Sequence, residues 1–481
     1  MRFLAWILAL SLTCLPRAFA QVLPDLGDVS SSDLPPATER KVGEEIMRDI
    51  RMHEPAYLDD PEIAEYLNAV GAQLSGGASG SHQEFEFFVM RDSSINAFAL
   101  PGGFIGVHTG LISASDNESE IASVLAHEMG HVTQRHIARQ IGIQKQMQMP
   151  MMVAMAAAIL LGRSRPDLAG GAAMAAQGGA IQSQLRYSRD FEREADRIGF
   201  QTLAAAGFDV HAMAAFFEKM QRSMRIVDSG SVPVYLRSHP VTTERISDVQ
   251  ARAASQPYRQ HADSVEYHLV RAKVRAEAGE ARDAVRIFTD AVGDRRFASE
   301  PGAHYGLAVA LLRAKEPKRA EAEVAWLRAN RVGSPMVDTL DARMRAALGN
   351  KAGALEVLTA ARVRHPYRRS VLYALAATLQ EFGRFDEMLA LIDEPLRLYP
   401  RDGHLHEARA RAYAGLGKRL LQHQAQAEVY VLQGSLPAAI EQLQLAQTSG
   451  DGNFYELSAV DARLKELRRE RDREIQDAKK R

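Results

Sequence analysis

Two histidines four positions apart, with a glutamate directly after the first, are the residues of this 481-residue chain best suited to chemistry. They stand in the run HEMGH at residues 127–131, within a stretch whose apolar residues recur at helical spacing. On a helix, positions i and i+4 share a face, so His127 and His131 can both point at one metal ion. Glu128 then lies within reach of a water molecule at that ion and can act as its general base. The spacing therefore predicts a metal-dependent hydrolytic site.

A second predicted helix, from near Ser188 to Gly207, supplies acidic residues. Two histidines leave zinc short of the three protein ligands that a catalytic site normally has. Glu192 would complete a His-His-Glu set, and Asp196, one turn further on, can accept the free ring N–H of a ligand histidine and fix its tautomer. Glu194 points to another side of this helix. An ordinary solvated acidic face is the alternative interpretation of the pair.

The elements that position these helices can be predicted from periodicity. Apolar residues at helical spacing indicate two amphipathic helices over 39–74, and partial alternation over 84–108 indicates a small antiparallel sheet. The HEMGH helix is predicted to begin at a capping box of Ser115 and Glu118 and to run past His136. His136 is then off the ligand face, and we expect it to have a structural role.

Behind residue 255 the chain becomes rich in Ala, Leu, Arg and Glu, and a repeat is visible. Turns of the form Gly-x-x-x-x-Ala, or close variants of it, start at Gly279, Lys315, Gly349 and Gly383. Their fifth-following residues are 36, 34 and 34 positions apart, which resembles the tetratricopeptide repeat. Gly434 with Ala439 would be a further unit, with a slip of register around Gly417. An unrelated helical bundle is the alternative.

The first twenty residues resemble a secretory signal peptide, with a basic start, an apolar run and a small-x-small end that predicts cleavage after Ala20. An uncleaved membrane anchor is the alternative. Residues 21–36, rich in Pro, Ser and Asp, are predicted to form a flexible arm. Cys14, the single cysteine, lies in the leader, so the mature chain would have no disulfide. Lys plus Arg (59) balance Asp plus Glu (60), which implies no nucleic-acid partner.

Two apolar stretches, 147–161 and 168–181, separate the two predicted site helices. Each is too short to span a bilayer alone. We expect residues 141–185 to form a hairpin that is buried or loosely ordered. The alternative is a lid whose soft, methionine-rich surface over 147–181 makes peripheral contact with a membrane.

Motifs around the site helices carry a resemblance to a known family. These motifs are NAFALPGG at 96–103, HExxH at 127–131, E-x-x-x-D at 192–196, SHP at 238–240 and Arg245. Together they resemble the HtpX and CAAX-prenyl-protease family of gluzincin metallopeptidases. The leader and the trailing repeats are similar to a periplasmic branch of that family, so the likeness in architecture extends over nearly the whole chain.

The resemblance implies which residues form the site. It implies one Zn²⁺ per chain on four ligands, the last of them in a resting state only: His127, His131, Glu192 and His239. Glu128 and Asp196 would be the catalytic carboxylates, the first as general base and the second as the group that orients a ligand histidine. For His239, a simple turn and cap ahead of a helix is the alternative.

The expected fold is mainly α. An α+β zinc metalloprotease (gluzincin) domain with a small antiparallel sheet would occupy 37–255. An all-α tetratricopeptide-repeat solenoid over 256–455 and a charged helix or tail over 456–481 would follow.

The resemblance also implies a function. It implies a periplasmic endopeptidase that degrades misfolded or stalled outer-membrane proteins and assists their assembly. Its partners would be unfolded or partly assembled outer-membrane β-barrel proteins and, through the repeats, the outer-membrane assembly machinery. We expect 96–107 to supply an edge strand along which an extended peptide pairs. A repeat-based chaperone or adaptor with a mostly latent zinc site is the alternative.

Overall fold

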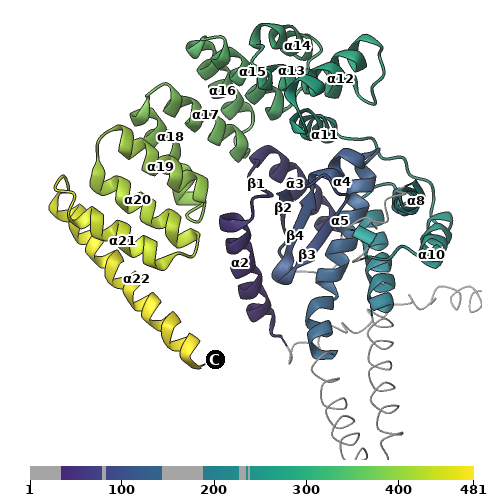
Figure 1. Cartoon of the computed structure of the whole chain (residues 1–481), viewed down its shortest axis with the longest axis horizontal. Coiled ribbons are helices and arrows are strands. Elements are labelled where there is room, and N and C mark those ends of the chain that lie inside the picture. The colour runs from purple at the N-terminus through teal and green to yellow at the C-terminus, as the bar shows by residue number, and fades with distance from the viewer. Residues whose placement is uncertain (1–33, 78–82, 144–187, 227–234, 237–238, 481) are drawn as a thin grey trace, which may run out of the picture.

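The computed structural model describes residues 34–77, 83–143, 188–226, 235–236 and 239–480 (Figure 1). The predicted signal peptide, residues 21–33 of the predicted arm, and residues 144–185 of the predicted hairpin lie outside the described residues. Within the ranges that are described, no helix combines the length and the apolar character needed to cross a membrane.

Two helices lie ahead of residues 84–108, as predicted: α2 (Pro36–His53) and α3 (Pro61–Gly77). Each has a proline at its first position, where the missing N–H would have no partner inside the helix in any case. The apolar face of α3 is fully buried and packs on the sheet, with Gly71 in close contact with the ring of Phe87. This helix therefore forms the base on which the sheet lies.

The sheet is mixed, so the prediction of an antiparallel sheet was wrong for its central pair. Its strands are β1 (Tyr57–Leu58), β2 (Glu86–Met90), β3 (Ala97–Leu100) and β4 (Phe104–His108). Their order is β1-β2-β4-β3; β4 pairs antiparallel with β3 but parallel with β2. After β2 the chain crosses to the outer edge, and the β3–β4 hairpin returns β4 to the middle. Alternation of residues reveals the two faces of a strand but not the direction of its neighbour.

The helix that carries HEMGH is α5 (Glu118–Thr133), and its start lies two residues beyond the predicted one. Asn117 is the N-cap and accepts from the backbone N–H of Glu120, whose carboxylate accepts in return from the N–H of Asp116. Ser115 instead ends the short helix α4 (Thr109–Ala114), and its hydroxyl donates to the carbonyl of Ile112. The cap resembles a capping box, but it lies two residues beyond the predicted one, and the carboxylate accepts from the residue ahead of the N-cap.

The predicted continuation of α5 past His136 was also wrong. The helix stops at Thr133, Arg135 takes a left-handed φ of 51°, and helical residues 136–143 follow as a separate segment. The Arg135 side chain donates to the Glu39 carboxylate and to the Leu34 carbonyl, so contacts from the N-terminal region hold this break. Helix propensity alone does not reveal such a tertiary constraint.

Helical residues 188–205 cross α5 at very close range, and Gly207 with φ 83° ends them as predicted. A β-carbon on Gly130 of α5 would lie 2.9 Å from the carbonyl oxygen of Ala195, and one on Gly199 would lie 2.9 Å from the backbone nitrogen of His127. Two glycines therefore allow the two site helices to touch backbone to backbone. The helices α8 (His211–Ile226) and α10 (Thr243–Ala254) complete this half of the molecule.

The remaining helices form successive antiparallel hairpins that arch over and beside the first half (Figure 1). They are α11 (Val265–Glu277), α12 (Ala281–Gly293), α13 (Glu300–Arg313), α14 (Pro317–Ala329), α15 (Pro335–Ala347), α16 (Lys351–Arg364), α17 (Arg369–Glu381), α18 (Phe385–Leu398), α19 (Gly403–Gly415), α20 (Arg419–Leu432), α21 (Leu436–Gln447) and α22 (Phe454–Lys480). The predicted turns at Gly279, Lys315, Gly349 and Gly383 all have positive φ and each joins the two helices of one hairpin.

The register does not slip at Gly417, contrary to the prediction. Gly417 has φ 70° and joins α19 to α20, 34 residues after Gly383, so the repeat continues in frame. Gly434 has φ 76° and joins α20 to α21, and thus lies between two hairpins rather than inside one. The turn at Gly417 was missed because Gln422, not a small residue, stands five positions after it.

Polar contacts fix the repeats to the start of α3. Buried Lys273 of α11 pairs with Asp60 at 2.5 Å and with Glu62 at 2.7 Å. Further along, the Ser370 hydroxyl of α17 donates to Glu65 at 2.6 Å. Helices far apart in the sequence thus meet on one acidic helix end.

Candidate metal centre

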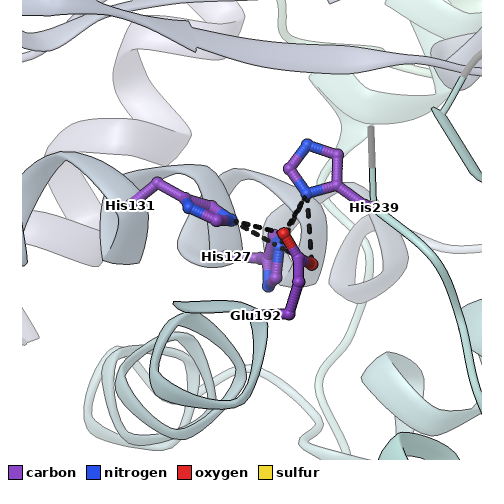
Figure 2. Close-up of side chains that lie close together, drawn as sticks. All are labelled: His127, His131, Glu192 and His239. Atoms are coloured by element: carbon purple, nitrogen blue, oxygen red, sulfur yellow. Dashed lines mark hydrogen bonds and ion pairs between the residues drawn. The ribbon is translucent and has the colours of Figure 1, made fainter. Parts of the chain in front are cut away.

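Four side chains from three segments converge between α5 and helical residues 188–205 (Figure 2). His127 and His131 project from one face of α5, and Glu192 faces them from the second helix. His239 enters from the chain just ahead of α10. One ligand atom from each of the four lies within 4.8 Å of all the others. These four residues, here called the metal cluster, are the four that the sequence predicted.

The short distances in the metal cluster suit a small ion. The two Nε2 atoms of His127 and His131 are 3.0 Å apart, and each is 3.4 Å from an oxygen of Glu192. Nδ1 of His239 is 3.4 Å from Nε2 of His127 and 3.0 Å from Oε1 of Glu192. Ligands at about 2.0–2.1 Å around a tetrahedral Zn²⁺ are separated by about 3.3 Å. The donor types and their spacing therefore suit this ion.

Glu128 lies beside the metal cluster, on the same turn of α5. It is only 1% exposed, and among the described residues its Oε1 has no hydrogen-bond donor; Nε2 of His239 lies 3.5 Å away. A buried carboxylate oxygen without a donor is costly unless a bound polar molecule satisfies it. This oxygen is thus suited to accept a proton from a ligand in the site.

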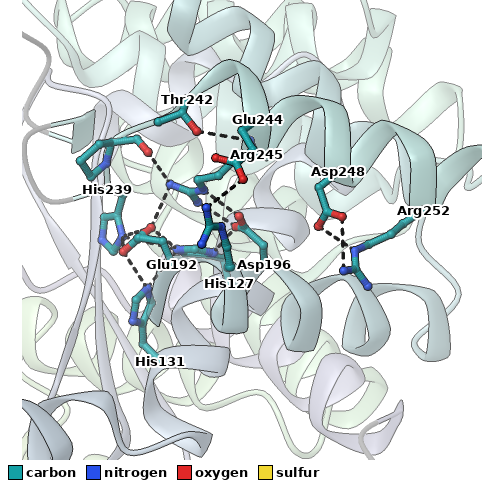
Figure 3. A network of polar contacts seen from close by, with 12 residues as sticks. His127, His131, Glu192, Asp196, His239, Thr242, Glu244, Arg245, Asp248 and Arg252 are labelled. Atoms are coloured by element: carbon teal, nitrogen blue, oxygen red, sulfur yellow. Dashed lines mark hydrogen bonds and ion pairs between the residues drawn. The ribbon is translucent and has the colours of Figure 1, made fainter. Parts of the chain in front are cut away.

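A buried arginine holds the carboxylates of the second helix in place (Figure 3). Arg245 of α10 donates to both oxygens of Asp196, at 2.6 and 2.7 Å, and lies 2.9 Å from Glu192. Burial would raise the pKa of the Asp196 carboxyl, but Arg245 and His127 outweigh burial and lower it. Asp196 therefore stays ionised, with Oδ1 3.0 Å from Nδ1 of His127.

The charge state of His127 follows from these neighbours. Burial alone would lower its pKa, but Asp196 and Glu192 raise the pKa to about 10. The two carboxylates thus favour the protonated imidazole. A metal ion needs the lone pair of Nε2, so its binding would compete with this proton.

Sequence reasoning missed part of the site. The sequence places Arg245 in a motif but predicts no partner for it. His136 was given a structural role, yet its Nδ1 lies 2.9 Å from Nδ1 of His131. Glu194 lies away from the metal cluster, as expected, but its Oε2 is 3.2 Å from Nε2 of His136. The signal in the sequence is a histidine five residues after HExxH. Only the helix break at Arg135 brings this histidine into contact with His131.

Comparison with known proteins agrees with this geometry. The model of peptidase family M48 matches residues 61–253. A "Beta-barrel assembly-enhancing protease" of Escherichia coli (strain K12) is 30% identical over 458 residues, which cover 94% of this chain and 93% of that protein. This chain belongs to the β-barrel assembly-enhancing proteases of peptidase family M48. It is therefore a metalloprotease by family, and the metal cluster is the metal site of that family.

Two further matches cover less of this chain. A "Putative beta-barrel assembly-enhancing protease" of Vibrio cholerae serotype O1 is 38% identical over 320 residues, 65% of each chain. A solved tetratricopeptide repeat protein from Parabacteroides merdae covers 51% of this chain with 15% identity and a TM-score of 0.29. The description of the repeats rests on the helical hairpins themselves.

Proposed function

We propose that this M48 protein is a zinc-dependent endopeptidase of the periplasm that degrades misfolded or stalled outer-membrane β-barrel proteins and assists their assembly. The names of its relatives support the link to β-barrel assembly. The leader-like residues 1–20 support export. In this proposal the repeats, which make up nearly half of the chain, dock the substrate or the assembly machinery.

The chemistry would be divided among few side chains. His127, His131 and Glu192 would hold the ion. When bound, zinc supplies Lewis-acid chemistry, which polarises the scissile carbonyl and acidifies water. Glu128 would take the proton from the attacking water and pass it to the leaving amine, because no described residue donates a hydrogen bond to its buried Oε1. Asp196 would hold His127 in the tautomer that presents Nε2.

Substrate would bind as an added strand. β3 is an edge strand that lies along α5, the helix that carries HEMGH, and most of its residues are half-buried rather than covered. An extended peptide can pair with such an edge through backbone hydrogen bonds, largely independent of its side chains. Unfolded or strand-forming chains would therefore be preferred over folded proteins.

The observation that carries the proposal is the convergence of the four side chains of the metal cluster, with Glu128 beside them. The test is Glu128→Gln, which keeps the shape of the side chain but cannot accept the proton. We expect cleavage of an unfolded β-barrel protein to fall by about 10²–10⁴-fold while the zinc content stays at one per chain. Full cleavage by zinc-loaded Glu128→Gln protein would refute the peptidase mechanism.

His239 would keep the site closed at rest. Its Nδ1 lies where a fourth ligand belongs, 3.0 Å from Glu192, and its ring stacks on Tyr235 at 4.8 Å. A substrate carbonyl or an attacking water would compete for this position. We expect His239→Ala to raise the rate of proteolysis, measured as kcat/KM on an unfolded substrate; unchanged or lost activity would count against an inhibitory role.

This closed arrangement also favours a second candidate, a repeat-based chaperone or adaptor with a mostly latent site. The two functions separate in cells that carry Glu128→Gln in place of the normal protein. If that variant fully restores outer-membrane protein assembly, binding is the main function. If it restores assembly only in part, peptide-bond cleavage is required.

A further inference from the structure

The two histidines of α5 are supported differently on the side that faces away from the metal cluster. Nδ1 of His127 faces a carboxylate directly, with Oδ1 of Asp196 at 3.0 Å. For Nδ1 of His131, the described contact is another imidazole, with Nδ1 of His136 at 2.9 Å. The two rings meet nearly edge to face, with centroids 4.9 Å apart and an interplanar angle of 77°. The second support is thus built from a histidine outside the ligand set.

The break after α5 makes this contact geometrically feasible. In an unbroken helix, a residue five positions on is rotated by about 140° from the first and points to another side. Here Arg135 adopts φ 51°, and the following segment starts with His136 behind His131. A residue other than glycine is strained in the left-handed backbone conformation. It keeps this conformation only where surrounding contacts impose it. The strained backbone at Arg135 thus places His136 next to His131.

His136 is itself firmly held. It is 4% exposed, and its ring stacks on Phe191 at 4.5 Å and 15°. Its Nε2 lies 3.2 Å from Oε2 of Glu194, an oxygen that also accepts from Arg139 at 2.7 Å. The Arg139 guanidinium in turn lies over the Phe191 ring at 4.6 Å. The position and ring plane of His136 are therefore fixed from two sides.

The Glu194 carboxylate fixes the direction of the hydrogen bonds that link Glu194, His136 and His131. An ionised carboxylate only accepts, so Nε2 of His136 donates to Glu194. The other nitrogen of a neutral imidazole then accepts, and Nδ1 of His131 must be the donor. His131 is left with a lone pair on Nε2, the atom that faces Glu192 in the metal cluster.

We propose that Glu194 and His136 act together as positioning residues that hold His131 in the tautomer and orientation needed to bind the metal. The inference rests on the metal-binding function proposed above. It gives the site two parallel supports: Arg245 and Asp196 behind His127, and Arg139, Glu194 and His136 behind His131. Both carboxylates come from the helix that supplies the ligand Glu192.

His136→Phe is the decisive variant, because it keeps a flat ring against Phe191 and removes both nitrogens. We expect its Kd for Zn²⁺, measured by competition with a chromogenic chelator, to rise by about 10–100-fold. The visible absorption of the Co²⁺-loaded protein should also change, since the geometry of one ligand is no longer fixed. Thermal unfolding of the metal-free proteins shows whether each variant is folded.

A matched control exists in the repeats. His304 of α13 is 8% exposed, stacks on Trp326 at 3.8 Å and 14°, and contacts Glu323 at 2.6 Å. His304→Phe therefore removes a buried, stacked and carboxylate-bound imidazole of the same kind, far from the metal cluster. Its affinity for Zn²⁺ should equal that of the wild type.

Glu194→Gln provides a second route if His136→Phe does not fold. The Glu194 side chain is 17% exposed, and glutamine keeps its size. We expect a smaller loss of Zn²⁺ affinity, because the amide oxygen still accepts but without charge. The double variant should lose no more affinity than His136→Phe alone, since both residues act through one hydrogen-bonded chain.

The outcomes are distinct. If wild-type protein binds no Zn²⁺, the proposed function and this inference fail together. If the wild type binds Zn²⁺ and both variants bind it within about threefold with an unchanged Co²⁺ spectrum, only the inference fails. Loss of affinity in His136→Phe and Glu194→Gln but not in His304→Phe supports it.

Discussion

At the scale of residues, three carboxylates on one helix serve three different partners. Glu192 is part of the metal cluster, Asp196 contacts His127 and Arg245, and Glu194 contacts His136. Residues two apart on an α-helix point about 200° away from each other, so Glu194 reaches a different neighbour from the other two. One helix thus provides a ligand and the supports of both ligand histidines.

Asp196→Asn tests the support of His127. We expect Zn²⁺ affinity to fall by about 10–100-fold, because the amide no longer favours a proton on Nδ1 of His127 and Arg245 loses a charged partner. Metal titration of the purified variant measures this. The control is Asp248→Asn, which removes the exposed pair of Asp248 with Arg252 and should leave Zn²⁺ affinity unchanged. Equal affinities in both variants would contradict the assigned role.

The ligands could be predicted from the sequence because the chemistry of zinc limits the types and the spacing of residues that bind it. His127 and His131 had to share a helix face. Glu192 was the acidic residue that shares a helix face with Asp196, so one could bind the metal while the other contacts a ligand histidine. His136 could not be recognised, because its approach to His131 depends on a backbone break that contacts from Glu39 and Leu34 stabilise.

At the scale of elements, the site depends on the close approach of two helices. Gly130 and Gly199 are the points of contact, each facing the backbone of the other helix. A side chain at either position would separate the helix that carries the histidines from the one that carries Glu192. The zinc ligands lie on both sides of this contact.

Gly199→Ala should therefore impair both folding and metal binding. The new methyl group would lie 2.9 Å from the backbone nitrogen of His127, which cannot move aside without shifting a ligand. We expect a loss of about 1–3 kcal/mol in the free energy of unfolding, together with weaker Zn²⁺ binding. Gly293→Ala is the control, since a β-carbon there meets no atom of the part of the chain that the structure describes within 4 Å. Denaturant unfolding and metal titration report the two effects.

In the sheet, sequence patterns predict the positions of strands but not their order or relative direction. Alternating residues predicted strands near 84–108, and three of the four strands lie there. The parallel pairing of β2 with β4 depends on which strand occupies the middle. That order involves tertiary packing, because β2 packs on α3 and the β3–β4 hairpin packs on α5.

At the scale of the whole molecule, titratable groups join the repeats to the first half. Nε2 of His404 in α19 lies 3.2 Å from Oδ1 of Asp59, ahead of α3. The hydrogen bond with Asp59 raises the pKa of His404, and the same bond lowers the pKa of Asp59. Both groups therefore stay charged over a wider range of pH in the folded protein than in the unfolded chain.

The sign of the pH effect follows from these directions. The contribution of His404 is complete below its unfolded pKa of about 6.5 and is lost as pH rises through the raised folded value. The contribution of Asp59 is present above its unfolded pKa and is lost as pH falls through the lowered folded value. The pair thus stabilises the protein most at mildly acidic pH.

His404→Gln should remove this contribution. Because the His404 side chain is 39% exposed, solvent screening limits the pair to about 0.2–1 kcal/mol. We expect the difference in Tm between wild type and variant to be largest near pH 5–6 and to vanish as pH rises well above 7. His53→Gln, which affects only an exposed pair within α2, serves as the control. A difference that persists in alkali would exclude His404 as its source.

The fixed contacts between the repeats and α3 also restrict how this chain can evolve. Ser370 and His404 are 34 residues apart, so they are equivalent positions in neighbouring units, and each contacts its own acidic residue, Glu65 or Asp59. A free-standing array tolerates duplication or excision of a whole unit. Here such an event would place Ser370 or His404 away from its acidic partner. Natural variants should therefore conserve the number of repeat units up to α19 and vary in length only beyond it.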